Sequence, residues 1–186
     1  IASYYYHCHP KTQIEMRLVV LGGGESGVGS AILAKKHGVD IFLSDKGKIN
    51  DHYKNVLEDI GINWEDEMHS ESVILKADLV IKSPGIPDSS PLIIKLNELG
   101  VPVISEIEFA SRYTDAMLIG ITGSNGKTTT TMLTNHLLSA GGLQVGMAGN
   151  IGDSFAKMVA QKDLAYYVLE ISSFQLDGIE RFAPHI

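Results

Sequence analysis

The sequence predicts an α/β protein built on parallel sheets. Short apolar runs rich in β-branched residues alternate with helix-like segments of about ten residues, an order typical of strands covered by helices on both faces. Two of these strands run directly into glycine-rich loops, "GGGESGVG" from Gly22 and "GSNGKTTT" from Gly123. Helix-like sequence follows each loop, as in nucleotide-binding loops. The sequence therefore predicts two successive nucleotide-binding units.

The elements follow this alternation along the chain. The expected strands are the apolar runs, which in order are Arg17–Leu21, Asp40–Ser44, Leu79–Lys82, Pro102–Ile104, Met117–Ile121, Gln144–Met147 and Tyr166–Ile171. The expected helices lie between them and are Gly27–His37, Asp51–Ile60, Ser90–Leu99, Glu106–Arg112, Lys127–Ala140 and Gly152–Gln161. No internal repeat or low-complexity segment interrupts the series.

A domain boundary is expected near residues 105–115, where one series of strands and helices ends and a second begins with its own loop. We expect a Rossmann-like domain at 16–105, followed at 106–186 by the start of a P-loop ATPase-type domain. Three expected strands are fewer than such a domain usually has, which predicts an incomplete unit. Residues 1–15 are interpreted as a disordered leader or extension before Met16, and a metal site at His7, Cys8 and His9 is the less favoured interpretation.

Composition narrows the function classes. The 186-residue chain has a formal net charge of −7, which argues weakly against nonspecific nucleic-acid binding. Its single cysteine, Cys8, excludes an intrachain disulfide and favours a reducing compartment, the cytoplasm. No apolar run approaches the roughly 20 residues needed to cross a bilayer, so no membrane span is expected.

The second loop carries the strongest chemical signal. Its core reads G-x-x-G-K-T from Gly123 to Thr128, shorter than the strict P-loop pattern because Ile121 stands where that pattern has glycine. Successive backbone N–H groups in such a loop bind phosphate oxygens. Lys127 can then reach the β and γ phosphates, and the Thr128 hydroxyl can ligate Mg²⁺.

Two polar residues accompany this loop. Glu170 ends an apolar strand, where a P-loop enzyme places a carboxylate that orients Mg²⁺, although a lone glutamate there is often a surface residue. Asn150 lies in "AGNIG" and could instead cap the helix expected from Gly152.

The first loop fits the dinucleotide fingerprint G-x-G-x-x-G with Gly22, Gly24 and Gly27. Asp45 follows it by about 20 residues, where an acidic residue accepts hydrogen bonds from a ribose, although a turn or capping role is equally compatible. "SPGIP", from Ser83, offers a hydroxyl and free N–H groups at a strand end, or a purely structural proline turn. Taken alone, these features suggest NAD and hydride transfer.

The motifs "GGGESGVG", "SPGIP", "ITGSNGKTTT", "AGNIG" and "LEISSFQL" together resemble the Mur ligase family of peptidoglycan synthesis, over nearly all of 16–186. The resemblance implies an ATP-dependent ligase that activates a substrate carboxylate as an acyl phosphate, which an amino-acid amine then attacks. "LEISSFQL" with the first loop points to the member that adds D-glutamate to UDP-N-acetylmuramoyl-L-alanine. The family's third domain has no counterpart here, so the chain is expected to be an inactive fragment.

The resemblance also assigns roles residue by residue. The residues implied to bind ATP are Gly123, Ser124, Asn125, Gly126, Lys127, Thr128 and Thr129. Lys127, Glu170 and Asn150 are the implied catalytic residues, and Thr128 and Glu170 are the implied Mg²⁺ ligands. The residues implied to contact the UDP-sugar are Glu25, Ser26, Gly27, Asp45, Lys46, Ser83, Pro84, Gly85 and Asn150. A carboxylate at Glu25 would repel a diphosphate unless its side chain points away.

Three alternatives remain open at this point. An NAD-dependent oxidoreductase would use the first loop and leave the second unexplained. A folate-type ligase would share the second loop but bind no UDP-sugar. A noncatalytic nucleotide-binding fragment would bind the UDP-sugar without turnover.

Overall fold

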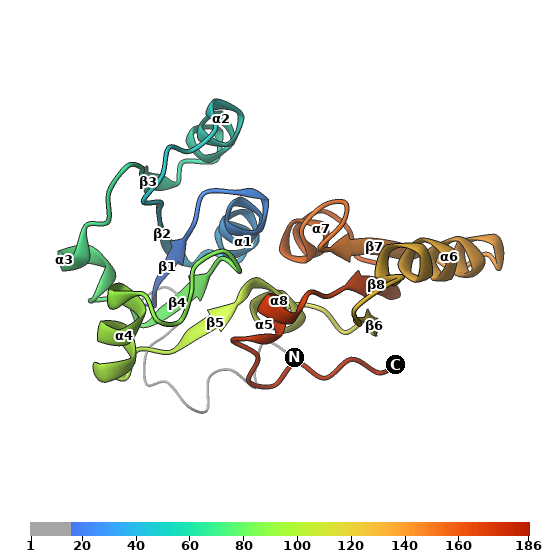
Figure 1. Ribbon diagram of the computed structural model, residues 1–186. Coiled ribbons are helices and arrows are strands. Elements are labelled where there is room, and N and C mark those ends of the chain that lie inside the picture. Colours follow the sequence, from blue (N-terminus) through green and yellow to red (C-terminus); the bar gives the residue numbers. More distant parts are fainter. Residues whose placement is uncertain (1–15) are drawn as a thin grey trace.

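The computed structural model describes residues 16–186, which form two parallel sheets side by side with helices packed around them (Figure 1). This confirms the predicted α/β class. The interpretations offered for residues 1–15, including the metal site at His7, Cys8 and His9, lie outside the described residues. Within the described part, no helix has the length and apolar character required to span a bilayer.

The first sheet has the strand order β3-β2-β1-β4-β5, and its strands all run parallel. They are β1 (Arg17–Leu21), β2 (Asp40–Ser44), β3 (Asn63–Glu65), β4 (Leu79–Lys82) and β5 (Val103–Ser105). Its helices are α1 (Glu25–Lys36), α2 (Asp51–Asp59), α3 (Glu71–Ile74) and α4 (Pro91–Glu98). The strand order reverses at β1, which places the loop after β1 at the crevice where such sheets bind ligands.

The second sheet has the order β6-β8-β7 and is also parallel. Its strands are β6 (Met117–Ile121), β7 (Val145–Gly149) and β8 (Tyr166–Glu170). The helices of this half are α5 (Glu106–Ser111), α6 (Lys127–Ala140), α7 (Phe155–Gln161) and α8 (Ser173–Leu176). β8 lies between its two neighbours, so its carboxyl end is flanked by both of their following loops.

Three short elements were not predicted. β3, with the sequence "NWE", is a polar edge strand that pairs only with β2, so it lacks the apolar run that marks the other strands. The four-residue helices α3 and α8 are too short to show a helical period. α7 begins at Phe155 rather than at the predicted Gly152, because Gly152 has a φ of +73° and Ser154 is the N-cap.

One continuous apolar core joins the two sheets. Helices α1, α5 and α7 pack together between them, and the buried cluster includes Leu33 of α1, Phe109 of α5 and Phe155 of α7 (Figure 1). Phe155 meets the ring of Tyr167 on β8 edge to face, with the ring centroids 5.3 Å apart. The second sheet is therefore anchored to the first through α7.

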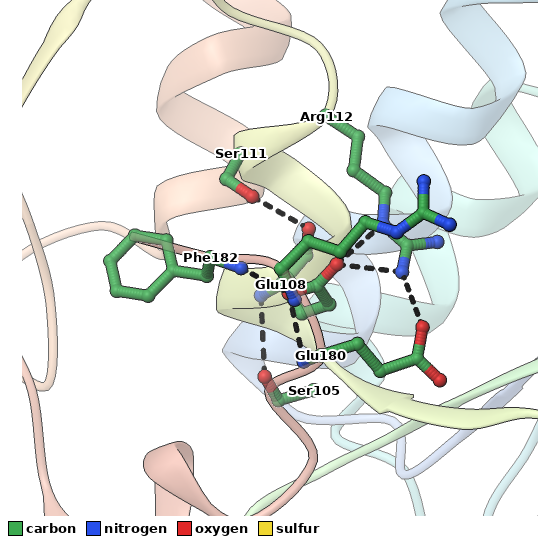
Figure 2. Close-up of polar contacts among 7 residues, drawn as sticks. Ser105, Glu108, Ser111, Arg112, Glu180 and Phe182 are labelled. Carbon is green, nitrogen blue, oxygen red and sulfur yellow. Dashed lines mark hydrogen bonds and ion pairs between the residues drawn. The ribbon is translucent and has the colours of Figure 1, made fainter. Parts of the chain in front are cut away.

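A buried carboxylate ties the last residues of the chain to α5. Figure 2 shows Glu108, whose Oε2 accepts hydrogen bonds from the backbone N–H groups of Glu180, Arg181 and Phe182 at 3.1, 2.9 and 2.7 Å. Its Oε1 pairs with Arg112 at 2.6 Å, and Arg112 also reaches Glu180 at 3.0 Å. Because a buried charge is costly unless it is fully paired, this arrangement is what lets Glu108 lie in the interior.

Candidate nucleotide-binding sites

The first glycine loop, Gly22–Gly24, joins β1 to α1 at close quarters. Gly22 has a φ of +104°, its N–H donates to the Ser44 carbonyl at 2.9 Å, and a Cβ on it would overlap the Ser83 side chain. At Gly27 a Cβ would overlap the Gly22 carbonyl. Only glycine permits these approaches. The structure therefore brings the loop, the start of α1 and Ser83 together.

Asp45 braces this loop from the end of β2. Its Oδ2 accepts a hydrogen bond from the Gly23 N–H, and its Oδ1 accepts one from the Gly47 N–H at 2.7 Å. A carboxylate has room for further hydrogen bonds, so these contacts leave a ribose hydroxyl possible at the same group. The ribose role predicted for Asp45, and the contacts predicted for Lys46, stay predictions.

The "SPGIP" segment lies beside the first loop. The Ser83 N–H donates to the Leu21 carbonyl at 2.9 Å, which continues the pairing of β4 with β1. Beneath the segment, the buried Lys82 donates to the Ile86 carbonyl at 2.8 Å and pairs with Asp88 at 2.7 Å. Sequence reasoning missed this lysine, although a charged residue that ends an apolar strand was a visible signal.

The contacts predicted for Ser83, Pro84 and Gly85 stay predictions. The same holds for Ser26, in the first turn of α1.

Glu25 carries the charge that raised a difficulty for a diphosphate. Its Oε2 accepts a hydrogen bond from the Tyr53 hydroxyl at 2.9 Å. Its Oε1 lies 3.2 Å from Lys157 Nζ and 3.4 Å from the Ser154 backbone nitrogen, both at the start of α7. The side chain is thus held by α2 and α7, and a lysine of the second half of the chain balances its charge. Tyr53 and Lys157 carry no sequence signal, since they lie far along the chain from the loop.

The second loop joins β6 to α6. Gly126 is the N-cap of α6 with a φ of +76°, and Gly123 has a φ of +141°, so both adopt backbone conformations that favour glycine. Residues 122–126 are exposed, and Lys127 Nζ donates to the Gly123 carbonyl at 2.7 Å across the loop. Thr128 and Thr129 follow in the first turn of α6. Strand, loop and helix are arranged as the P-loop interpretation predicts.

Glu170 and Asn150 meet at the carboxyl edge of this sheet. Glu170 pairs in register with Ile121 on one side and Gly149 on the other, which places it between the two loops. Its Oε1 accepts a hydrogen bond from Asn150 Nδ2 at 2.8 Å. Asn150 does not cap α7, because the Ser154 side chain does so by accepting from a backbone N–H at 3.2 Å.

The second carboxylate oxygen of Glu170, Oε2, is the atom that could ligate Mg²⁺. Glu170 is 2% exposed, and Oε2 has no hydrogen-bond partner among the described residues. Such an orphaned buried oxygen fits a site completed by a ligand. The described residues contain no cluster of three or more His, Cys, Asp or Glu side chains, whereas Mg²⁺ is commonly held by one or two carboxylates with substrate phosphates. The residues present therefore fit Mg²⁺ bound together with a nucleotide.

A further buried carboxyl, Glu106, was not singled out by the sequence. It lies in the first turn of α5 and accepts a hydrogen bond from the Ala156 N–H of α7 at 2.5 Å, while its Oε2 has no partner among residues 16–186. Burial raises the pKa of its carboxyl to about 7. It lies between α5 and α7, and the negative charge of Glu25 also raises its pKa.

Comparison with known protein families agrees with this geometry. Residues 17–91 match the MurD N-terminal domain, and residues 121–185 match the Mur ligase middle domain. The chain belongs to the Mur ligase family. Each of the two matched ranges contains one of the two glycine loops.

Named relatives of this Mur ligase chain are close. It is 65% identical over 170 residues to the UDP-N-acetylmuramoylalanine–D-glutamate ligase of Christiangramia forsetii, covering 91% of this chain and 38% of the relative. The enzyme of the same name from Bacteroides fragilis is 58% identical over the same shares. The chain thus spans about two fifths of the length of these relatives.

Solved structures show the same fold. The UDP-N-acetylmuramate:L-alanyl-gamma-D-glutamyl-meso-diaminopimelate ligase from Neisseria meningitides matches with a TM-score of 0.57 and 22% identity, over 83% of this chain and 52% of that one. A pseudomurein peptide ligase type C from Methanothermus fervidus matches with a TM-score of 0.52 and 27% identity, over 85% of this chain and 33% of that one. The Mur ligase architecture therefore accommodates both halves of the chain.

Proposed function

We propose that this chain is part of an ATP-dependent ligase that joins D-glutamate to UDP-N-acetylmuramoyl-L-alanine in peptidoglycan precursor synthesis. The relatives that cover most of the chain bear this activity in their names. The observation that carries the proposal is the pairing of two glycine loops, one beside Ser83 and the other beside the buried, half-satisfied carboxylate Glu170.

The second loop is the proposed ATP site. Residues 123–129 would surround the phosphates with backbone N–H groups and the amino end of α6, and Lys127 would balance charge on the transferring phosphoryl group. Thr128 and Glu170 would hold Mg²⁺, which supplies charge neutralisation at the phosphates. Asn150 fixes the Glu170 carboxylate by donating a hydrogen bond to its Oε1, so Oε2 would be the oxygen available to Mg²⁺.

The first loop is the proposed binding site for the diphosphate of the UDP-sugar. The residues proposed to surround this diphosphate are Ser26, Gly27, Ser83, Pro84 and Gly85. The residues implied at the uridine end are Asp45 and Lys46. No N-cap side chain accepts a hydrogen bond from the start of α1 in the described part of the chain, and the free N–H groups of a helix start favour a phosphate. Asn150, on the second half, is proposed to lie where the two ligands approach each other.

The chemistry proposed for the whole ligase needs no protein nucleophile. The substrate carboxylate attacks the γ-phosphorus of ATP, ADP leaves, and the resulting acyl phosphate is attacked by the D-glutamate amine with release of phosphate. The contribution of this chain is positioning and charge balance at the transferring group. The reducing compartment expected from the single cysteine, the cytoplasm, belongs to the same proposal.

The family match weighs against the alternatives. An NAD-dependent oxidoreductase leaves the second loop without a role. The middle domain alone would leave a folate-type ligase open, but the MurD N-terminal domain match over 17–91 favours the UDP-sugar ligase.

Calorimetry and a turnover assay test the proposal together. The 186-residue chain is expected to bind UDP-N-acetylmuramoyl-L-alanine, and to release no phosphate above background when ATP, Mg²⁺ and D-glutamate are added. Affinity for a pteroyl substrate with none for the UDP-sugar would favour the folate-type ligase, and tight retention of NADH would favour the oxidoreductase.

A further inference from the structure

An ion pair links the first glycine loop to the second half of the chain. Glu25 is the first residue of α1, directly after Gly24, and its Oε1 lies 3.2 Å from Lys157 Nζ on α7. Lys157 also pairs with Asp153 at 2.8 Å. The side chains of Lys157 and Glu25 are 28% and 34% exposed, so bulk water screens this pair only in part.

The packing beneath the pair leaves little freedom for it to rearrange. α1 and α7 lie side by side between the sheets, where Gly29 faces Ser154 and Lys157 (Figure 1). A Cβ on Gly29 would overlap the Ser154 hydroxyl and lie 3.1 Å from the Lys157 Cβ. The start of α7 therefore packs directly against the first turns of α1.

At the start of α1, the helix end and the Glu25 side chain have opposite effects on a bound anion. The amino end of α1 favours an anion, but the Glu25 carboxylate on its first residue disfavours one. The hydrogen bond from Lys157 to Asp153, and then that to Glu25, raise the pKa of Lys157, so that this ammonium stays charged at physiological pH. Without Lys157, the negative charge of Glu25 would stand beside the loop unbalanced.

We infer that Lys157, a residue of the second half, sets the affinity of the first glycine loop for a diphosphate by neutralising Glu25. The inference rests on the proposed function in that it takes the loop as a diphosphate site. It makes Lys157 an affinity-setting residue that acts through Glu25 and does not itself touch the ligand. It also explains how a loop can carry a glutamate at the very point where the phosphate is expected.

A double-mutant cycle tests the inference by calorimetry with UDP and, separately, with inorganic pyrophosphate. All proteins carry Lys127→Ala, which is expected to remove phosphate binding at the second loop. Lys157→Met is expected to weaken binding of both probes by about three- to tenfold, since the carboxylates of Glu25 and Asp153 then lose their shared ammonium partner and repel the anion. Glu25→Gln is expected to tighten binding by a similar factor, and the double variant Glu25→Gln, Lys157→Met is expected to return close to the starting affinity.

The control is a second lysine that spans the same two helices. Lys36, in the last turn of α1, donates to the Ala160 carbonyl of α7 at 2.7 Å, at the end of the interface remote from the loop. Lys36→Met is expected to leave both affinities unchanged. Thermal unfolding of each variant verifies that the chain remains folded.

The outcomes separate the inference from the proposed function. If Glu25→Gln and Lys157→Met both weaken binding and the double variant is weaker still, the pair is merely structural and the inference is overturned. Unchanged affinity in Lys157→Met overturns it as well. If the chain binds pyrophosphate with the expected pattern but not UDP, the inference stands and the proposed UDP-sugar function fails.

Discussion

The two glycine loops are supported in opposite ways. The first is braced by neighbouring elements, since Gly22, Gly23 and Gly27 are fixed by contacts with β2, the Ser83 segment and each other. The second is exposed and is shaped by its own backbone, with glycines at positive φ and a single cross-loop contact from Lys127. Pre-formed support would suit the proposed binding of a large substrate at the first loop, whereas the second loop would gain most of its contacts from the proposed phosphate ligand.

The same contrast extends to the two halves. The first sheet has five strands and helices on both of its faces, while the second has three strands, and α6 leaves Met132, Leu133 and Leu137 exposed. What holds the second half in place is a set of buried groups on α5 and α7. The second half is therefore held mainly by buried contacts among its own elements, and α7 packs it against α1 of the first half.

The largest expected effect comes from the buried carboxylate that holds the end of the chain. Glu108→Ala is expected to lower the free energy of unfolding by about 4 kcal/mol, because it removes a buried partner of Arg112 and the acceptor of three backbone N–H groups. Urea unfolding measures the loss. Glu180→Ala, which removes only the half-exposed partner of Arg112, is the control and is expected to cost less than about 1 kcal/mol. Equal losses in the two variants would contradict the central role given to Glu108.

The next largest effect is the pH dependence that Glu106 gives to the free energy of unfolding. Its pKa is raised to about 7 by burial, so between pH 4.5 and 7 the folded chain holds a proton that the unfolded chain has lost. The stability contributed by this proton is complete below pH 4.5 and disappears as the pH rises through 7, a change on the order of 3 kcal/mol. Glu106→Gln is expected to remove this fall in a series of urea titrations from pH 4.5 to 8.5. An identical pH profile in the variant would show that Glu106 is ionised throughout.

A smaller loss of stability is expected when a side chain is added at a close contact in the first loop. Gly27→Ala is expected to cost about 2 kcal/mol, because its Cβ would enter the space of the Gly22 carbonyl and force α1 away from β1. Gly24→Ala is the matched control, since a Cβ there meets nothing within 4 Å. Thermal unfolding compares the two, and a loss in Gly24→Ala as large as in Gly27→Ala would refute the steric account.

The smallest effect is expected in the second loop. Gly126→Ala places a side chain at a φ of +76° in open space, so only backbone strain of about 1 kcal/mol is expected. The variant is checked by the same unfolding measurement. A loss well above that of Gly27→Ala would reverse the contrast between a packed first loop and an open second one.

The sequence predicted the parts of this fold that repeat a pattern. Apolar runs and glycine loops located both sheets and both candidate sites, because these features are local. The polar edge strand β3 escaped notice since no burial pattern marks it. The contacts of Glu25 with Lys157 and of Glu106 with Ala156 could not be predicted, because they join residues 132 and 50 positions apart that only the folded chain brings together.

The central claim is that the two loops are separate sites, one for the UDP-sugar and one for ATP. Calorimetry of the unsubstituted chain and of Lys127→Ala, each with UDP-N-acetylmuramoyl-L-alanine and with a nonhydrolysable ATP analogue plus Mg²⁺, tests it most directly. The account predicts that Lys127→Ala loses the ATP analogue and keeps its affinity for the UDP-sugar. Loss of both ligands, or retention of both, would contradict the assignment of one ligand to each loop.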